Sequence, residues 1–229
     1  MPEGSAVRTM FSGIASRYDL ANRVLSLGLC VGWRNRMVEA VKACAPADVA
    51  DLATGSGDVA FALRAALPTS AAITGYDFCE PMLELGRRRA ADAGVRLEFR
   101  TGDCMRLPIA DASCDAVTIA YGVRNFEDRG RGLRELRRVV KPGGSVFILE
   151  FSRPDAWFAP LHFIHVRCVL PLAAALLTGD LGAYRYLGTS IAGFPDAEGL
   201  ADELKAAGFG RVSHERMLFG TVALHRAVA

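Results

Sequence analysis

The 229-residue sequence carries little net charge and contains no long hydrophobic run. Lysine and arginine exceed aspartate and glutamate by only 27 − 25 = 2, whereas a dedicated nucleic-acid-binding domain is strongly basic. The longest apolar stretch, at about 168–177, is far shorter than the ~20 residues that span a bilayer. The N-terminus lacks the apolar core of a secretory signal. We therefore expect a cytoplasmic protein without a nucleic-acid partner.

Closely spaced cysteine pairs are also missing. The six cysteines include no C-x-x-C pair of the kind used by zinc and redox sites, so we expect free thiols. His162, His165 and Cys168 follow one another at intervals of three, but no nearby carboxylate completes a ligand set. We expect these three residues to be ordinary helix residues, and we expect no metal site.

The composition that is present is that of an ordinary globular protein. Hydrophobic residues make up 51% and charged residues 23% of a 24.5 kDa chain, which is long enough to bury a core without disulfides. Disordered, collagen-like and coiled-coil proteins do not fit these values. Mean hydropathy is slightly positive, at +0.21, so the location of the apolar excess is informative.

From residue 48 onward, short apolar runs alternate with helical patterns. Such alternation predicts a mainly parallel sheet with helices on both faces, and nearly continuous apolar runs indicate strands buried on both sides. Pro81 suits the first turn of a helix, and Lys141-Pro-Gly-Gly is expected to end another. The predicted strands are 48–53, 71–76, 95–100, 115–120, 145–151, 211–217 and 221–226, and the predicted helices are 57–66, 81–93, about 130–140 and 196–207.

A glycine-rich loop, residues 51–58 (DLATGSGD), lies between the first predicted strand and its helix. Ligands of open parallel sheets bind at the carboxyl ends of the strands, where glycines let the backbone approach them closely. Asp77 ends the second strand 77 − 57 = 20 residues after Gly57, a spacing typical of acids that bind ribose hydroxyls. The alternative is a tight turn together with a solvated aspartate.

Two nucleotide-like cofactors compete for this loop. Residues 55–60 fit the G-x-G-x-x-A fingerprint of dinucleotide-binding proteins, which places a pyrophosphate at a helix N-terminus. Asp51 and Asp58 are expected to repel a pyrophosphate. S-adenosylmethionine (SAM) carries no phosphate, its cationic sulfonium and ammonium suit acidic residues, and the loop N–H groups suit its carboxylate. We therefore expect SAM and not NAD.

A third loop, Gly102-Asp103-Cys104, follows the third predicted strand, where an adenine would lie. Asp103 is positioned to accept a hydrogen bond from the exocyclic amine, and Cys104 to donate one from its backbone N–H. The alternative for Asp103 is that it caps a turn. Together, these loops resemble those of class I SAM-dependent methyltransferases.

Three further segments resemble the ubiquinone/menaquinone biosynthesis C-methyltransferases. They are residues 18–33 (YDLANRVLSLGLCVGW), 119–126 (IAYGVRNF) and 138–152 (RVVKPGGSVFILEFS). The resemblance extends over nearly the whole chain, and the first two segments are its most specific part. Ala21, Cys30 and Ala120 depart from the family pattern, which usually has Met, His and a small hydroxyl residue there. The glycine loop is more similar to that of menaquinone-type members.

The resemblance implies a Rossmann-like class I methyltransferase fold, with a mainly parallel seven-stranded sheet, helices on both faces and an antiparallel C-terminal strand. It implies that SAM methylates a ring carbon of a polyprenyl quinol precursor, with demethylmenaquinol as the expected substrate. The alternatives are the methoxy-polyprenyl-benzoquinol of ubiquinone biosynthesis, both quinols, another lipophilic phenol, or a non-catalytic SAM-binding partner. The residues implied to hold SAM are Gly55, Ser56, Gly57, Asp77, Asp103 and Cys104.

Arg124 and Asn125 are the candidate catalytic residues, because they follow the fourth predicted strand, next to the expected methyl group. The guanidinium of Arg124 is expected to stabilise a phenolate, directly or through water, while its pKa above ~12 makes it a poor base. Asn125 is expected to bind a ring oxygen. The alternative for Arg124 is a surface ion pair with Glu127 or Asp128.

We expect one domain over residues 1–229. N-terminal helices occupy 1–45, the SAM-binding core 46–152, an apolar helical lid or substrate insertion 153–194, and a C-terminal helix and strand hairpin 195–229. The apolar part, which holds only two charged residues between 154 and 179, predicts a cap on the sheet, a wall for the isoprenoid tail and a membrane-facing patch. Peripheral contact with the inner face of the cell membrane follows as a hypothesis, and a homodimer stays open.

Overall fold

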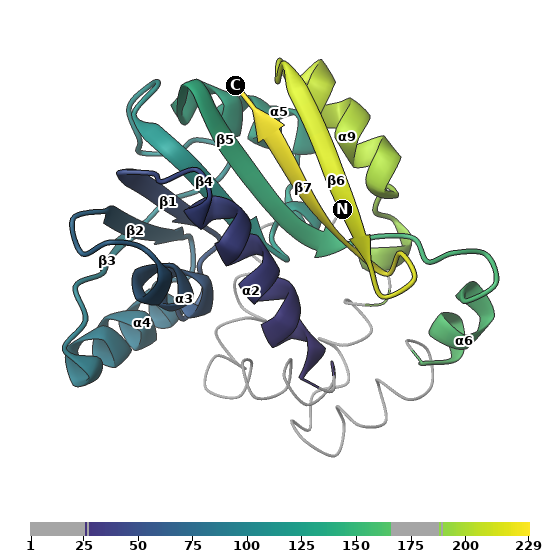
Figure 1. Ribbon diagram of the computed structural model, residues 1–229, viewed down its shortest axis with the longest axis horizontal. Helices are drawn as coiled ribbons and strands as arrows, with labels where there is room; N and C mark the ends of the chain where they lie inside the picture. Colours follow the sequence, from purple (N-terminus) through teal and green to yellow (C-terminus); the bar gives the residue numbers. More distant parts are fainter. Residues whose placement is uncertain (1–25, 27, 166–187, 189) are drawn as a thin grey trace.

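The computed structural model describes residues 26, 28–165, 188 and 190–229, with one seven-stranded sheet at its centre (Figure 1). The strands are β1 (Asp48–Leu52), β2 (Ala72–Asp77), β3 (Glu98–Thr101), β4 (Cys114–Ala120), β5 (Val140–Phe151), β6 (Arg211–Met217) and β7 (Val222–Val228). Their order is β3-β2-β1-β4-β5-β7-β6. β7 is antiparallel to both neighbours, whereas the other pairs are parallel. The predicted fold class is confirmed.

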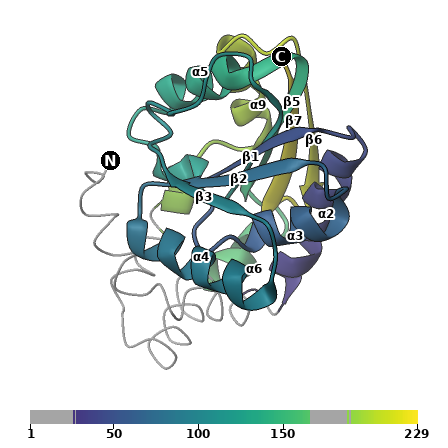
Figure 2. The same cartoon turned by 90° about the vertical axis from the view of Figure 1, so that its left-hand side faces the viewer.

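Helices cover both faces of the sheet, as the view in Figure 2 shows. They are α2 (Leu29–Lys42), α3 (Asp58–Ala66), α4 (Glu80–Ala93), α5 (Arg129–Val139), α6 (Ala159–Ile164) and α9 (Ala197–Ala206), with a 3₁₀ turn η1 (Val123–Asn125). On one face, Met37 of α2 and Leu63 of α3 share a buried cluster with Phe147. On the other, Leu133 of α5 and Leu204 of α9 share one with Ile148. β5 therefore contributes to both halves of the core.

Helix ends follow the local sequence. Pro81 occupies the first turn of α4, where its missing N–H costs nothing. Asp128 and Asp196 cap α5 and α9, and each side chain accepts a hydrogen bond from a backbone N–H in the first turn. Because these signals are local, the predicted helices that correspond to α3, α4 and α9 differ from the structure by at most one residue at either end.

β5 differs from its prediction, because it begins at Val140, directly after α5, and not at Ser145. Cys114 of β4 pairs with Val140, and the pairing resumes between Ala116 and Ser145. Residues 141–144, the Lys-Pro-Gly-Gly sequence, therefore bulge out of the ladder between these pairs. The sequence that was expected to separate helix from strand instead forms an irregularity within the strand.

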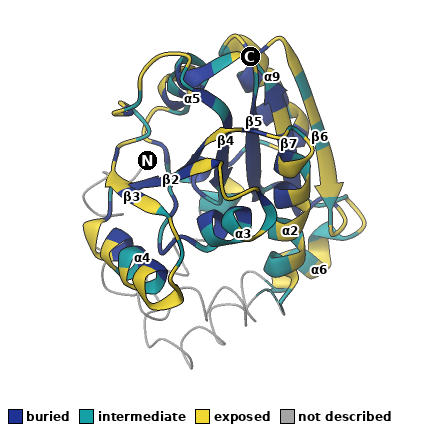
Figure 3. Ribbon diagram, turned by 60° about the vertical axis from the view of Figure 1, so that its left-hand side comes forward, coloured by how far each residue is buried: buried dark blue, intermediate teal, exposed yellow. Residues whose placement is uncertain are grey.

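The second half of β5 is buried from Ser145 to Glu150, and Figure 3 shows the neighbouring central strands as similarly buried. The edge strand β6 is partly exposed along its whole length. A glutamate in the buried part of β5 is unusual, because carboxylates are rarely enclosed unless they are paired. This residue, Glu150, is paired with Arg124, whose Nη1 lies 2.9 Å from Glu150 Oε1.

After β5 the chain passes along the end of the β6–β7 hairpin and continues into α6 (Figure 1). The Asp155 N–H donates to the Phe219 carbonyl at 2.8 Å, and the Asp155 carboxylate accepts from Arg216 at 2.6 Å. Much of the predicted lid, with Cys168, lies outside the described residues. Within the described part of the chain, no helix combines the length and apolarity needed to cross a bilayer.

Candidate functional site

The glycine loop connects β1 to α3 at the carboxyl edge of the sheet. Its backbone enters the left-handed region at Ala53 (φ 48°), Gly55 (φ 55°) and Gly57 (φ 92°). A Cβ on Gly57 would lie 2.7 Å from the Phe99 ring, so a side chain does not fit there. The loop thereby brings the N–H groups at the start of α3 to the edge where such sheets bind ligands.

Asp77, the last residue of β2, is bonded directly to the glycine loop. Its Oδ2 accepts a hydrogen bond from the Gly55 N–H, and its Oδ1 accepts one from the Cys79 N–H, both at 2.9 Å. Burial raises the pKa of this carboxyl, although the backbone donors act in the opposite direction. Each carboxylate oxygen has a second acceptor site, which suits the two hydroxyls of a ribose. These groups therefore fit a nucleoside such as that of SAM.

Cys104 and Asp103 lie close to Asp77. Burial raises the pKa of the Cys104 thiol, and the charges of Asp77 and Asp103 add to the effect. Asp103 Oδ1 accepts a hydrogen bond from the Met105 N–H at 2.8 Å, so this residue does cap a turn. A capped turn does not test contact with adenine, which stays a prediction.

Asp51 supports the glycine loop from inside the protein, where it is 1% exposed. Thr54 Oγ1 donates to its Oδ2 at 2.5 Å, and Thr118 Oγ1 of β4 donates to its Oδ1 at 2.7 Å. Burial is the main cause that raises the pKa of Asp51 to about 7, and the charge of Asp77 adds to it. Asp51 is thus an enclosed structural carboxyl that ties β1, the loop and β4 together.

Asp58, the first residue of α3, binds two arginines. Arg34 of α2 donates to its Oδ2 and Arg89 of α4 donates to its Oδ1, each at 2.8 Å. Because these two cations compensate its charge, Asp58 is not the isolated negative charge on which the expected repulsion of a pyrophosphate was based. Ser56, which was predicted to hold SAM, is buried, and its hydroxyl accepts a hydrogen bond from Arg89 at 2.9 Å.

Arg124 follows β4 and points into the protein. Its side chain is 3% exposed, and its Nη1 donates to Glu150 Oε1 at 2.9 Å. The same nitrogen donates to the Tyr121 carbonyl. Arg124 is therefore not the solvent-exposed ion pair with Glu127 or Asp128 that was the alternative at the level of sequence.

Glu150 holds both the side chain and the backbone of Arg124. Its Oε2 accepts from the Arg124 N–H at 3.2 Å, and its Oε1 also accepts from the Phe151 N–H at 2.9 Å. The guanidinium lies over the Phe151 ring, 5.3 Å from the centroid. Because burying an ion pair costs desolvation energy, a pair kept at the carboxyl edge of the sheet is a candidate functional element.

The turn that carries Arg124 packs against the glycine loop. A Cβ on Gly122 would lie 2.7 Å from the Ala53 Cβ, so the close approach requires glycine. Asn125 ends η1, where its N–H donates to the Gly122 carbonyl at 3.0 Å. Tyr121 begins the turn in the left-handed region, with φ 56°. The structure thus brings the two predicted catalytic residues next to the predicted cofactor loop.

Two important residues of this edge, Glu150 and Arg89, were not predicted. A signal existed for Glu150, because it is the only acid in the apolar run 145–151. No comparable signal marked Arg89, which is one of three consecutive arginines with Arg87 and Arg88. Only the rotation of α4 relative to the glycine loop distinguishes them.

Known proteins with similar sequences carry out methyl transfer. A model of the ubiE/COQ5 methyltransferase family matches residues 2–229. The chain is 44% identical to the demethylmenaquinone methyltransferase of Thermus thermophilus over 217 residues, covering 94% of this chain and 98% of that one. It is 38% identical over 226 residues to the ubiquinone/menaquinone biosynthesis C-methyltransferase UbiE of Geotalea daltonii, covering 97% and 96% of the two chains.

Among solved structures, a putative SAM-dependent methyltransferase from Methanococcus maripaludis is similar, with a TM-score of 0.65 and 18% identity over 94% of this chain and 92% of that one. Identity this low supports the fold alone. The family match, by contrast, covers nearly the whole sequence, including the glycine loop and the turn with Arg124. The chain belongs to the ubiE/COQ5 methyltransferase family, and it is a SAM-dependent methyltransferase.

Proposed function

We propose that this enzyme transfers a methyl group from SAM to a ring carbon of demethylmenaquinol and so produces menaquinol. The observation that carries the proposal is the buried Arg124–Glu150 pair beside the glycine loop, in a chain 44% identical to a demethylmenaquinone methyltransferase. A methoxy-polyprenyl-benzoquinol is the second candidate substrate, because another relative is named for both ubiquinone and menaquinone biosynthesis.

The groups at the glycine-loop edge suit SAM. Asp77 is proposed to accept hydrogen bonds from the ribose hydroxyls, for which both carboxylate oxygens are already oriented by backbone donors. SAM supplies an electrophilic methyl group on a cationic sulfur. The other residues proposed to hold it are Gly55, Ser56, Gly57, Asp103 and Cys104.

Methylation of an aromatic carbon requires an electron-rich ring. Loss of one hydroxyl proton turns the quinol into a phenolate, the new C–C bond forms as the C–S bond breaks, and the ring then loses its C–H proton. Orientation of the ring and stabilisation of its oxygen are the contributions expected from the protein. We assign the hydrogen bond to the phenolate oxygen to Arg124 and contact with a ring oxygen to Asn125.

Glu150 changes the way in which Arg124 acts. Its carboxylate compensates the guanidinium charge, so Arg124 contributes an oriented donor and not an isolated positive charge. Because Glu150 also binds the Arg124 N–H, the turn and the side chain are oriented by the same acid. Such support keeps a catalytic donor in one geometry.

The substrate is tested with radiolabelled SAM and two reduced acceptors, demethylmenaquinone and methoxy-polyprenyl-benzoquinone. We expect label in menaquinol. Label only in the benzoquinol product would show that the substrate is the quinol of ubiquinone biosynthesis. Label in neither product would contradict a quinol substrate.

Arg124→Ala tests the catalytic assignment. We expect kcat to fall by about 100-fold, as for the loss of one donor to a developing oxyanion, while calorimetry finds the SAM Kd within about twofold of wild type. Arg131→Ala, at an exposed position in α5, is the control. Loss of SAM affinity with unchanged kcat at saturating SAM would show that Arg124 is not catalytic.

We also propose that an apolar surface at the end of the β6–β7 hairpin contacts the membrane that holds the substrate. This tip surface is 39–68% exposed and consists of Trp157, Leu161, Phe163, Ile164, Leu218 and Phe219. The ring centroids of Trp157 and Phe219 are 4.8 Å apart, so the aromatic side chains form one cluster. Exposed apolar patches are typical of lipid and partner sites, and aromatic rings suit a membrane interface.

Flotation with liposomes tests this contact. We expect the wild type to float with the vesicles and Trp157→Ser to float less. Leu29→Ser removes a leucine of α2 that is 43% exposed and serves as the control. Absence of flotation with and without quinol in the vesicles would contradict membrane contact. A dimer in size-exclusion chromatography that Trp157→Ser disrupts would assign the tip surface to a second copy of the chain.

A further inference from the structure

A charged cluster outside the proposed catalytic residues binds the glycine loop. Arg89 Nη1 donates to the Ser56 carbonyl at 3.0 Å and to the Ser56 hydroxyl at 2.9 Å, and its Nη2 donates to Asp58 at 2.8 Å. The guanidinium also lies over the Phe61 ring, 4.9 Å from the centroid. Arg34 completes the cluster by donating to the second oxygen of Asp58. Two helices thus converge on the loop and on the first residue of α3.

Within this cluster, Arg89 binds Ser56, the residue between two glycines whose backbone is in the left-handed region. Ser56 lies between Gly55 (φ 55°) and Gly57 (φ 92°). Glycine populates many backbone conformations, so a loop of this kind needs contacts from outside to stay in one of them. Asp77 supplies such a contact at the Gly55 N–H, and Arg89 supplies the next one at Ser56.

Both contacts come from one corner of the fold. Asp77 ends β2, and Arg89 belongs to α4, which begins three residues later at Glu80. Leu83 and Ala90 of α4 form a buried cluster with Phe99 of β3, so the helix that carries Arg89 is held by packing against the sheet. Groups held by regular elements are positioned more accurately than groups on a free loop.

We propose that Arg89 is a positioning residue for SAM. By holding the carbonyl and hydroxyl of Ser56, it orients the loop N–H groups toward the cofactor, and Asp58 and Arg34 in turn orient Arg89. The inference rests on the SAM site proposed above and adds a residue that acts through Ser56. An ordinary ion pair between half-exposed side chains contributes only ~1 kcal/mol or less to stability and would leave ligand affinity unchanged.

The decisive comparison is between adjacent arginines of α4. Arg88 has a side chain that is 73% exposed and pairs with Glu84, so Arg88→Ala removes a similar charge without touching the loop. We expect Arg89→Ala to raise the calorimetric SAM Kd of the full-length protein about 10-fold and Arg88→Ala to change it less than about twofold. Thermal unfolding of both variants without ligand establishes that they are folded.

Steady-state kinetics separates positioning from a general loss of structure. We expect Arg89→Ala to raise the KM for SAM, while kcat at saturating SAM and the KM for quinol stay near wild type. Arg89→Lys keeps the charge but lacks the planar fork that reaches three acceptors, so we expect it to raise the SAM Kd about threefold. This variant also keeps the test decisive if the alanine variant does not fold.

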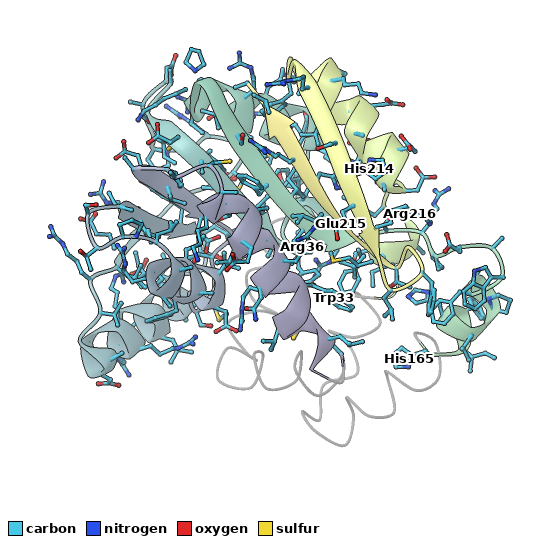
Figure 4. All side chains as sticks on the ribbon, in the orientation of Figure 1. Trp33, Arg36, His165, His214, Glu215 and Arg216 are labelled. Atoms are coloured by element: carbon cyan, nitrogen blue, oxygen red, sulfur yellow. The ribbon has the colours of Figure 1, made fainter. Side chains whose placement is uncertain are left out.

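Arg34 and Arg36 provide a second matched pair on α2. Arg36 extends from α2 toward Glu215 of β6 (Figure 4). Its Nε donates to Glu215 Oε2 at 2.9 Å. We expect Arg34→Ala to raise the SAM Kd about threefold and Arg36→Ala to leave it unchanged.

A folded Arg89→Ala or Arg89→Lys variant that binds SAM as tightly as the wild type would overturn the inference, as would an equal loss in Arg88→Ala. The quinol assignment fails separately. If no quinol is methylated but Arg89→Ala still weakens SAM binding, the proposed function is wrong and the role of Arg89 stands.

Discussion

The glycine-loop edge and the tip surface both lie at the carboxyl edge of the sheet, but their chemistry is opposite. At the loop, Asp51 and Asp77 are enclosed, and each is tied to defined donors, Asp51 to two threonines and Asp77 to two backbone N–H groups. At the tip, aromatic and aliphatic side chains such as Trp157 are exposed, and they contact one another without directional bonds.

This difference fits two kinds of ligand. Hydrogen bonds depend on angle and distance, so a network of them fixes a small polar molecule in one pose. Apolar contacts are non-directional and scale with area, so they accept a chain or a lipid surface in many arrangements. The turn with Arg124 combines both kinds of contact, because its guanidinium forms a buried ion pair with Glu150 and also lies over the apolar ring of Phe151.

The largest expected effect compares a buried acid with an exposed one. Glu150→Gln leaves the buried guanidinium of Arg124 without its counter-charge, so we expect the unfolding free energy to fall by about 3 kcal/mol. Asp155→Asn breaks the pair with Arg216 at the tip, where side chains are 34–44% exposed, and we expect a loss of about 0.5 kcal/mol. Urea unfolding of both variants measures the contrast. Equal losses would mean that Glu150 is not an essential partner of Arg124.

The second effect concerns cofactor affinity. Asp77→Ala removes the proposed ribose acceptor and the contact that holds Gly55, so we expect the SAM Kd to rise about 100-fold in calorimetry. Asp92→Ala, at an exposed position in α4, is the control. A tip variant such as Trp157→Ser is expected to leave this Kd unchanged. Retention of SAM affinity by Asp77→Ala would remove Asp77 from the binding site.

The third effect is a pH dependence at the loop edge. The folded pKa of Asp51, about 7, lies above the ordinary value of 3.8, so the folded state binds more protons than the unfolded state between these values. Stability contributed by this group is therefore fully present below pH ~4 and is lost as pH rises through ~7. Asp51→Asn should remove this component.

Urea unfolding at pH 5 and pH 8 tests the contribution of Asp51 to stability. From pH 5 to pH 8, we expect the unfolding free energy of the wild type to fall by about 2 kcal/mol more than that of Asp51→Asn. The pKa of His225 is lowered to about 4 by burial, and its titration acts with the opposite sign. Because His225 is present in both proteins, it cancels in the difference. An identical pH slope in wild type and variant would contradict the raised pKa of Asp51.

The smallest effect concerns the turn at the tip surface. Leu218 (φ 46°) and Phe219 (φ 54°) occupy left-handed positions that hairpins usually fill with Asn and Gly. The double variant Leu218→Asn/Phe219→Gly should relieve strain and raise the unfolding free energy by up to about 1 kcal/mol. It should also reduce vesicle flotation, because it removes two apolar side chains. A variant that is more stable and floats normally would separate the turn from membrane contact.

Much of the fold was predictable because its signals are local. The apolar runs and helical periods placed β1, α3, β2 and α4 near their observed bounds. Lys141-Pro-Gly-Gly was predicted to be a turn between a helix and a strand, but it forms a bulge within β5. Residue type does not distinguish a bulge from a turn, because a bulge depends on the register between β5 and β4. The glycines of residues 51–58 and Asp77 indicated the cofactor-binding edge of the sheet. They could do so because the end of a strand and the spacing between Gly57 and Asp77 are also local properties of the sequence.

The side-chain partners could not be predicted in the same way. Arg124 and Glu150 are separated by 26 residues, Arg34 and Asp58 by 24, and Arg89 and Ser56 by 33. Each pairing depends on how two elements pack and on the rotation of a helix about its axis. For that reason the sequence predicted a charged, repulsive Asp58, and the structure contains a carboxylate already held by two cations.

Residue patterns alone thus established the order of strands and helices, the glycine loop with Asp77 and the resemblance to quinol C-methyltransferases, since periodicity and spacing act over short distances along the chain. Packing decided which charges meet and which are buried. It enclosed Asp51, directed Arg124 toward Glu150 and set Arg89 against the glycine loop, because the energy of a charge depends on its surroundings in space and not on its neighbours in sequence.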